Sequence, residues 1–135
     1  LSIMAFGNLK FDTLTTSDSA NTNTEKSIDT SYLFNGSCKA WGSFTSEGTF
    51  IENDLFNTSS ITDSGTGSAR PNWASVFASA NYATTMSCED SSDYHGMMQQ
   101  VSNPSTSFVN ILSASATNTA RDVEFGFYMS MGDLA

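Results

Sequence analysis

Positive charge is scarce in this chain. Of its 135 residues, 5 are lysine or arginine and 14 are aspartate or glutamate, so the net charge is −9. A protein that binds nucleic acid needs a basic patch to neutralise phosphates, and so few basic residues cannot form one. We therefore expect no nucleic-acid partner, and we interpret the acidic excess as surface charge that keeps the protein soluble.

Long apolar runs are also missing. No stretch approaches the roughly 18 consecutive apolar residues that a membrane-spanning helix needs. The first residues, Leu1 to Met4, lack the basic segment and the longer apolar core of a secretory signal. We therefore expect no membrane partner.

Lysine and glutamate are rare whereas serine and threonine are abundant, which is the opposite of a helical composition. We expect short strands at residues 38–44, 49–56, 72–77, 81–88, 96–101, 106–113 and 121–131. Turn residues separate them, at positions 46–48, 63–65, 90–93, 103–104 and 117–119. Within 71–78 a single helical turn is an alternative. The spacing indicates an all-β protein, an antiparallel β-sandwich of jelly-roll-like form.

The last expected strand has the clearest pattern. Large apolar residues occupy alternate positions, namely Val123, Phe125, Phe127, Met129 and Met131, and smaller or polar residues and Tyr128 occupy the others. Because successive side chains of a strand point to opposite faces, the five apolar groups share one face. We expect that face to pack into the core and Tyr128 to lie on the opposite face.

The first part of the chain differs from the rest. Residues 17–31 are almost entirely polar and cannot bury enough surface to fold alone. We therefore divide the chain into an extended N-terminal arm with a polar linker, residues 1–34, and a sandwich domain, residues 35–135.

Residue types that carry chemistry form no pattern here. Cys38 and Cys88 are expected to be free, buried thiols that act as small hydrophobic groups, although a disulfide is possible if their strands are neighbours. The single histidine, His95, follows an acidic segment that has neither the glycine nor the glutamate of a calcium loop and too few ligands for zinc. No nucleophile elbow or phosphate-binding loop is present. We expect no enzymatic activity, no metal site and no cofactor.

One stretch of the sequence begins at Lys39-Ala40-Trp41, has Phe44 three residues later, and continues with Phe56-Asn57-Thr58-Ser59-Ser60-Ile61-Thr62-Asp63-Ser64-Gly65-Thr66-Gly67. This stretch resembles a domain of tailed-bacteriophage structural proteins. Ala80-Asn81-Tyr82-Ala83 follows in the order typical of that family. The resemblance covers roughly residues 38–90. Arg70-Pro71 departs from the pattern, so we expect that strand to start later.

The resemblance implies a virion structural protein that is assembled in the host cytoplasm and forms a homotrimer. We expect a capsid-decorating or cement protein, because the chain has no repeats or heptads from which a fibre shaft is built. The alternatives are a fibre tip that binds a host receptor and, in a different class, a free carbohydrate-binding module. The expected partners are other copies and virion proteins such as the major capsid protein.

Contacts with these partners are expected at two places. The opening Leu9-Lys10-Phe11-Asp12-Thr13-Leu14 resembles the start of phage fibre-type proteins, which implies an attachment role for Leu9, Phe11 and Leu14. Tyr82 and Tyr128 are expected at a chain–chain interface, where tyrosine is enriched.

Overall fold

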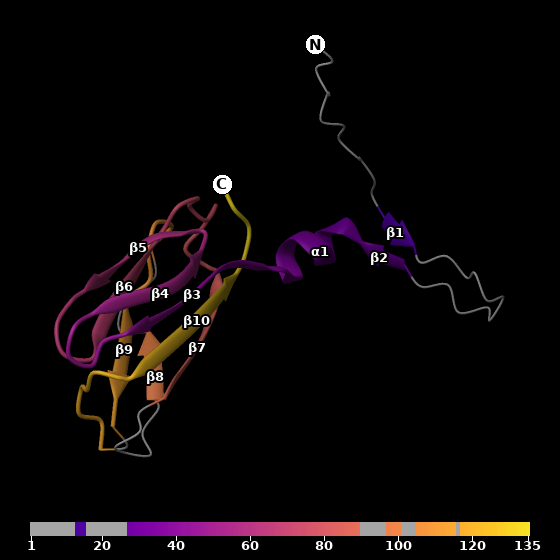
Figure 1. Ribbon diagram of the computed structural model, residues 1–135. Helices are drawn as coiled ribbons and strands as arrows, with labels where there is room; N and C mark the ends of the chain where they lie inside the picture. Colours follow the sequence, from indigo (N-terminus) through magenta and orange to yellow (C-terminus); the bar gives the residue numbers. More distant parts are fainter. Residues whose placement is uncertain (1–12, 16–26, 90–96, 101–104, 116) are drawn as a thin grey trace, which may run out of the picture. The chain divides into compact units, whose positions relative to one another are not determined.

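The structure is a computed structural model, and it describes residues 13–15, 27–89, 97–100, 105–115 and 117–135 (Figure 1). The chain divides into two compact units, Leu1–Gly36 and Ser37–Ala135. Each unit is described by itself below.

In the first unit, β1 (Thr13–Thr15) pairs antiparallel with β2 (Ser27–Asp29), and a short helix, α1 (Thr30–Gly36), follows directly. The helix begins where it does because the Asp29 side chain accepts a hydrogen bond from the Ser31 backbone N–H at 2.7 Å, as an N-cap residue does. This bond lowers the pKa of Asp29.

The second unit contains two antiparallel sheets of four strands each (Figure 1). The first sheet has the order β4-β3-β10-β7, in which the strands are β3 (Cys38–Thr45), β4 (Ile51–Phe56), β7 (Ala83–Glu89) and β10 (Phe125–Met131). The second has the order β5-β6-β9-β8, in which the strands are β5 (Thr58–Asp63), β6 (Ser68–Trp73), β8 (Met97–Gln100) and β9 (Ile111–Ala114). The predicted all-β class and antiparallel pairing are confirmed.

The chain passes from the first sheet to the second at Asn57. This residue has a φ of 50°, in the left-handed region, and its side-chain oxygen accepts a hydrogen bond from the Ser75 backbone N–H at 2.7 Å. Asparagine tolerates this conformation better than most residues. The corner lets Thr58–Asp63 form β5, a strand that the sequence analysis did not predict.

Strand β6 starts at Ser68 and contains Arg70-Pro71, so the expectation of a later start was wrong. Proline has no backbone N–H to donate. On one side of β6, Pro71 lies opposite Ile61 of β5. On the other side, β9 pairs with β6 only at Ser68 and Ala69. Pro71 therefore lies where the β9 ladder is interrupted, which is a position that proline can occupy. Its carbonyl still accepts a hydrogen bond from Val109 N–H.

One hydrophobic core contains residues from both sheets and from the connections between strands. Its buried members are Ala40, Phe44, Ile61, Ala69, Trp73, Phe77, Tyr82, Val109, Ile111, Val123 and Tyr128. The Trp73 ring lies at its centre, with ring centroids of Phe77, Tyr82 and Tyr128 between 5.6 and 6.0 Å away. Edge-on and tilted contacts of this kind add to the stabilisation from burial.

The expected orientation of the last strand was wrong. Val123 is buried before the strand begins, but Phe125, Phe127 and Met129 are exposed, and Tyr128 points into the core with its neighbours Gly126 and Ser130. The sequence therefore predicted the alternation of side chains along this strand, but it assigned the wrong face of the strand to the core.

The inner face of β10 has small residues because other side chains already occupy that space. A Cβ on Gly126 would lie 2.5 Å from the Phe44 ring, so the residue opposite this ring must be glycine. Ser130 is fully buried, and its hydroxyl forms a 2.8 Å hydrogen bond with the Thr84 hydroxyl. A phenylalanine or methionine would not fit at either position.

Cys38 and Cys88 are both half-buried and form no disulfide. Both of their strands pair with β10, but Cys38 lies opposite Met131 and Cys88 lies opposite Gly126. At about 3.3 Å per residue, these positions are too far apart along β10 for a bond that needs Cα atoms within about 7 Å.

Candidate functional site

The outward surface of the first sheet carries a cluster of exposed large apolar side chains. We call it the outer face and define it by Trp41, Phe56, Phe125, Phe127 and Met129, which are between 38% and 51% exposed. Isolated exposed apolar residues are normal on proteins, but a contiguous group marks an interaction surface.

The pairing of strands makes these residues neighbours. Phe56 of β4 lies opposite Trp41 of β3, and Trp41 lies opposite Met129 of β10. The rings of Trp41 and Phe56 are stacked with centroids 6.2 Å apart, and those of Phe125 and Phe127 are stacked with centroids 6.4 Å apart. The outer face is therefore continuous across three strands.

Uncharged residues extend the outer face toward β7. Thr85 and Ser87 lie opposite Met129 and Phe127, and a shallow groove of about 260 Å³ runs between these two strands. Carboxylates appear at the margins, where Asp54 lies opposite Ser43 and Glu89 lies opposite Phe125. The centre of the outer face is apolar and its edges are acidic.

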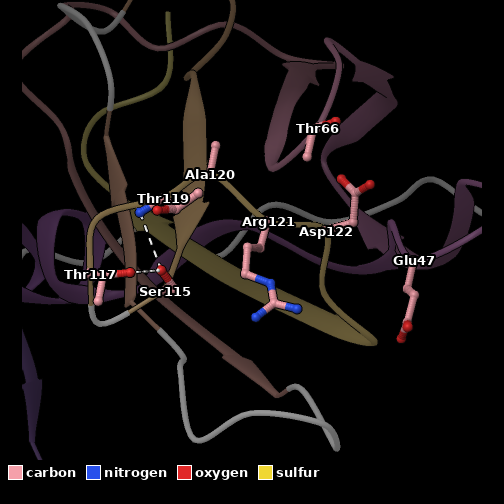
Figure 2. A pocket seen from close by; sticks show the side chains of 8 residues that line it. All are labelled: Glu47, Thr66, Ser115, Thr117, Thr119, Ala120, Arg121 and Asp122. Atoms are coloured by element: carbon pink, nitrogen blue, oxygen red, sulfur yellow. Dashed lines mark hydrogen bonds between the residues drawn. The ribbon is translucent and has the colours of Figure 1, made fainter.

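A second, very different surface is a polar cleft of about 670 Å³ (Figure 2). Three segments line it, namely the turn after β3, the turn between β5 and β6, and the connection from β9 to β10. The lining residues are Glu47, Thr66, Ser115, Thr117, Thr119, Ala120, Arg121 and Asp122. The sequence analysis did not identify this cleft, because its residues come together only through the fold.

Hydrogen bonds fix the walls of the cleft. The Asp122 carboxylate accepts a hydrogen bond from Gly67 N–H at 2.7 Å, and the Ser113 hydroxyl donates to the Arg121 carbonyl at 2.7 Å. Gly67 has a φ of 67°, and a Cβ there would lie 2.6 Å from the Arg121 backbone nitrogen. The two segments can approach this closely only because residue 67 is glycine.

The other side of the cleft is ordered by hydroxyl groups. The hydroxyls of Ser115 and Thr117 are 2.9 Å apart and share a hydrogen bond, and Ser115 also accepts one from Thr119 N–H at 3.2 Å. Figure 2 shows the Arg121 guanidinium in the space between these hydroxyls and the Glu47 carboxylate. Donors and acceptors thus surround the cleft.

The residues proposed from the sequence lie elsewhere. Leu9 and Phe11 are outside the described residues, and Leu14 lies in β1 opposite Ile28. Tyr82 and Tyr128, expected to be exposed, are buried with 8% and 4% of their surface accessible. The expected placement of both tyrosines is therefore corrected.

Both tyrosines use their hydroxyls inside the unit. Tyr82 donates to the carbonyl of Phe108 at 2.8 Å, and Tyr128 donates to the Thr58 hydroxyl at 2.8 Å. Burial raises the pKa of Tyr82, and burial raises the pKa of Tyr128 to about 12 because the charged phenolate is poorly solvated there.

Most of the acidic segment before His95, and His95 itself, fall outside the described residues. Within the described part of the chain, no group of three or more His, Cys, Asp or Glu side chains is placed to hold a metal ion. In the same part of the chain, no helix has the length and apolar character needed to cross a bilayer.

Comparisons of this chain with models of known protein families, with curated proteins and with solved structures find no match.

Proposed function

We propose that this protein is a structural protein of a tailed-bacteriophage particle, of the capsid-decorating or cement type. In this proposal the two sheets form a jelly-roll-like β-sandwich, three copies associate, and their neighbours are other virion proteins such as the major capsid protein. The observation that carries the proposal is the outer face, because it offers an apolar surface for assembly. The phage origin and the number of copies come from the sequence resemblance.

The outer face favours association because its side chains remain partly in water. Phe56, Phe127 and Met129 are each between 41% and 51% exposed. Complete burial of such a side chain is worth about 1.5–3 kcal/mol, so the exposed half of each offers roughly 1 kcal/mol. Several neighbouring side chains of this kind can offset the entropy lost when two chains associate.

The partner that best fits the outer face is a second copy of this chain. A basic partner would be recognised by carboxylates, but the carboxylates near this surface, Asp54 and Glu89, lie at its margins. Two copies with a net charge of −9 each repel one another unless they meet where neither carries charge. The centre of the outer face meets this condition.

The area of the sheet is sufficient for such a contact. Four strands about 4.8 Å apart, each about six residues long at roughly 3.3 Å per residue, cover about 400 Å² in projection. Side-chain relief increases the accessible area to roughly 600–800 Å² per copy, which approaches the size of a standard interface.

The test is the oligomeric state in solution. We expect sedimentation of the native protein to show self-association, and Phe127→Ser together with Met129→Ser to shift it toward the monomer. Val76→Ser is the matched control, because Val76 is 39% exposed and is not part of the outer face. A native protein that is monomeric at high concentration, or a double variant that associates as the native protein does, contradicts assembly through this face.

A fibre tip that binds a host receptor is the second candidate, and the polar cleft favours it. The cleft is built from connections between strands, which are the usual binding positions on sheet scaffolds. Immunogold labelling of phage particles that contain the protein distinguishes the two candidates. Label distributed over the head supports a decorating protein, and label at fibre ends supports a receptor-binding tip.

A further inference from the structure

We infer that the polar cleft between the turn after β3, the β5–β6 turn and the β9–β10 connection binds a neutral saccharide. This inference concerns a different surface from the outer face, and it does not depend on assembly into a particle. A volume of about 670 Å³ is sufficient for one or two sugar rings.

The first argument is the shape of the cleft before any ligand arrives. The Gly67 carbonyl accepts a hydrogen bond from Ser113 N–H at 2.8 Å, and Arg121 N–H donates to the Ser113 carbonyl at 3.1 Å. On the opposite wall, Glu47 N–H donates to the Val123 carbonyl at 3.1 Å. Backbone bonds thus hold all three segments, so a ligand would not have to order them first.

The second argument is the mixture of hydrogen-bonding groups. A sugar hydroxyl both donates and accepts, so it needs acceptors and donors close together. The cleft supplies acceptors from the carboxylates of Glu47 and Asp122, donors from the guanidinium of Arg121, and groups of both kinds from Thr66 and Thr117 (Figure 2). Carboxylate and guanidinium groups are planar and can each engage two adjacent hydroxyls of a ring.

The third argument is charge. Two carboxylates and one guanidinium line the cleft, and the chain as a whole carries −9. An anionic ligand such as a sugar acid or a sugar phosphate would meet this negative potential and bind less well. A simple cation would be held by the carboxylates and would make no use of the donors that Arg121 and the threonine hydroxyls supply. A neutral polyhydroxylated ligand can use donors and acceptors together.

The apolar parts of the lining are consistent with the same ligand. Four of the lining residues, Thr66, Thr117, Thr119 and Ala120, carry a methyl group. The ring carbons of a sugar carry C–H groups that need such contacts, whereas a fully ionic ligand does not. Without an aromatic platform among the lining residues, we expect weak binding, with a Kd in the millimolar range.

The experiment is a titration of the ¹⁵N-labelled chain with the methyl glycosides of glucose, galactose and mannose, followed by amide chemical shifts. We expect at least one glycoside to shift the amides of Glu47, Thr66 and residues 117–122 in a saturable way. Glucuronic acid and glucose 6-phosphate should bind at least 3-fold more weakly than the matching neutral sugar.

Two variants test the residues themselves. Glu47→Gln removes the negative charge and replaces one acceptor oxygen with an N–H donor, and Thr117→Val removes a hydroxyl. Both positions are exposed in the lining, and each change should weaken binding about 3- to 10-fold. Glu89→Gln makes the same change of charge on β7, outside the cleft, and should leave the affinity unchanged. Amide spectra of the variants away from the cleft report whether the fold is intact.

Several results would overturn the inference. The first is that none of the three glycosides causes saturable shifts at 50-fold molar excess over about 1 mM protein. The second is that the shifted amides lie outside the cleft. The third is that the anionic sugars bind more tightly than the neutral ones. Unchanged affinity in both cleft variants would also overturn it. Self-association through the outer face is measured separately, so either proposal can fail while the other stands.

Discussion

The Tyr128 hydroxyl donates a 2.8 Å hydrogen bond to the Thr58 hydroxyl, and this bond joins β10 of the first sheet to β5 of the second. Both side chains are buried, and the Tyr128 ring also contacts Trp73. Because a buried hydroxyl without a partner is costly, this pair stabilises one particular packing of the two sheets.

Replacing Tyr128 with phenylalanine tests that bond. The change leaves Thr58 without its donor in the core, so we expect the free energy of unfolding to fall by about 1–2 kcal/mol. Urea denaturation measures this difference. Tyr32→Phe is the control, because Tyr32 is 72% exposed and its replacement should have no effect. Equal stability of the two variants would show that the inter-sheet bond contributes nothing.

The same tyrosine predicts a dependence of stability on alkaline pH. The pKa of Tyr128 is about 12 in the folded protein and about 10 when the chain is unfolded. Between these values the unfolded state loses its proton first, so unfolding becomes more favourable as pH rises from about 10 to 12. Below pH 10 this contribution to stability is fully present. Tyr82, whose pKa is also raised, acts in the same direction.

Denaturation at a series of pH values measures the effect. We expect the loss of stability above pH 10 to be smaller in Tyr128→Phe than in the native protein, although Tyr82 maintains part of it. A native protein whose stability is constant from pH 9 to 12 would contradict the burial of both phenols.

Gly42 is the second position at which this part of the core can be tested. A Cβ there would lie 2.7 Å from the Tyr128 ring and 2.9 Å from the Leu55 side chain. We expect Gly42→Ala to destabilise the protein by about 2–3 kcal/mol, because β3 must move away from its neighbours. Gly36→Ala adds the same methyl where nothing lies within 4 Å and should change thermal stability only slightly. If both variants melt together, the close contact is absent.

The corner at Asn57 gives a prediction that separates conformation from hydrogen bonding. Asn57→Gly keeps the left-handed conformation but removes the side-chain bonds to the N–H and carbonyl of Ser75. Asn57→Ala removes these bonds and adds the strain of a positive φ. We expect the alanine variant to be less stable than the glycine variant by about 1 kcal/mol. The opposite order in chemical denaturation would show that φ is not positive.

The sequence predicted the class of the fold and all four strands of the first sheet, because short segments rich in aromatic and hydroxyl residues favour strands over helices. It did not predict β5, because the turn-like residues from Ser59 to Asp63 form a strand only when Asn57 directs the chain into the second sheet. Such a corner depends on contacts distant in sequence, in this case with Ser75.

The orientation of β10 shows a different limit. Alternation identifies two faces, and the more apolar one is normally inside. Here the Phe44 ring and the Tyr128 hydroxyl determine which face fits the core, so Phe125 and Phe127 are exposed. The pattern could not reveal this, because it contains no information about the volume available opposite each residue. The polar cleft was missed for a related reason, since Glu47 and Asp122 are distant in sequence.

The place of β10 between β3 and β7 has a consequence for biosynthesis. The ribosome makes β10 after every other described strand, so the middle of the first sheet stays open while the earlier strands emerge. During that interval β3 and β7 present unpaired backbone edges, and such edges invite pairing with other nascent chains. Translation speed and chaperone supply should therefore influence the yield of native protein.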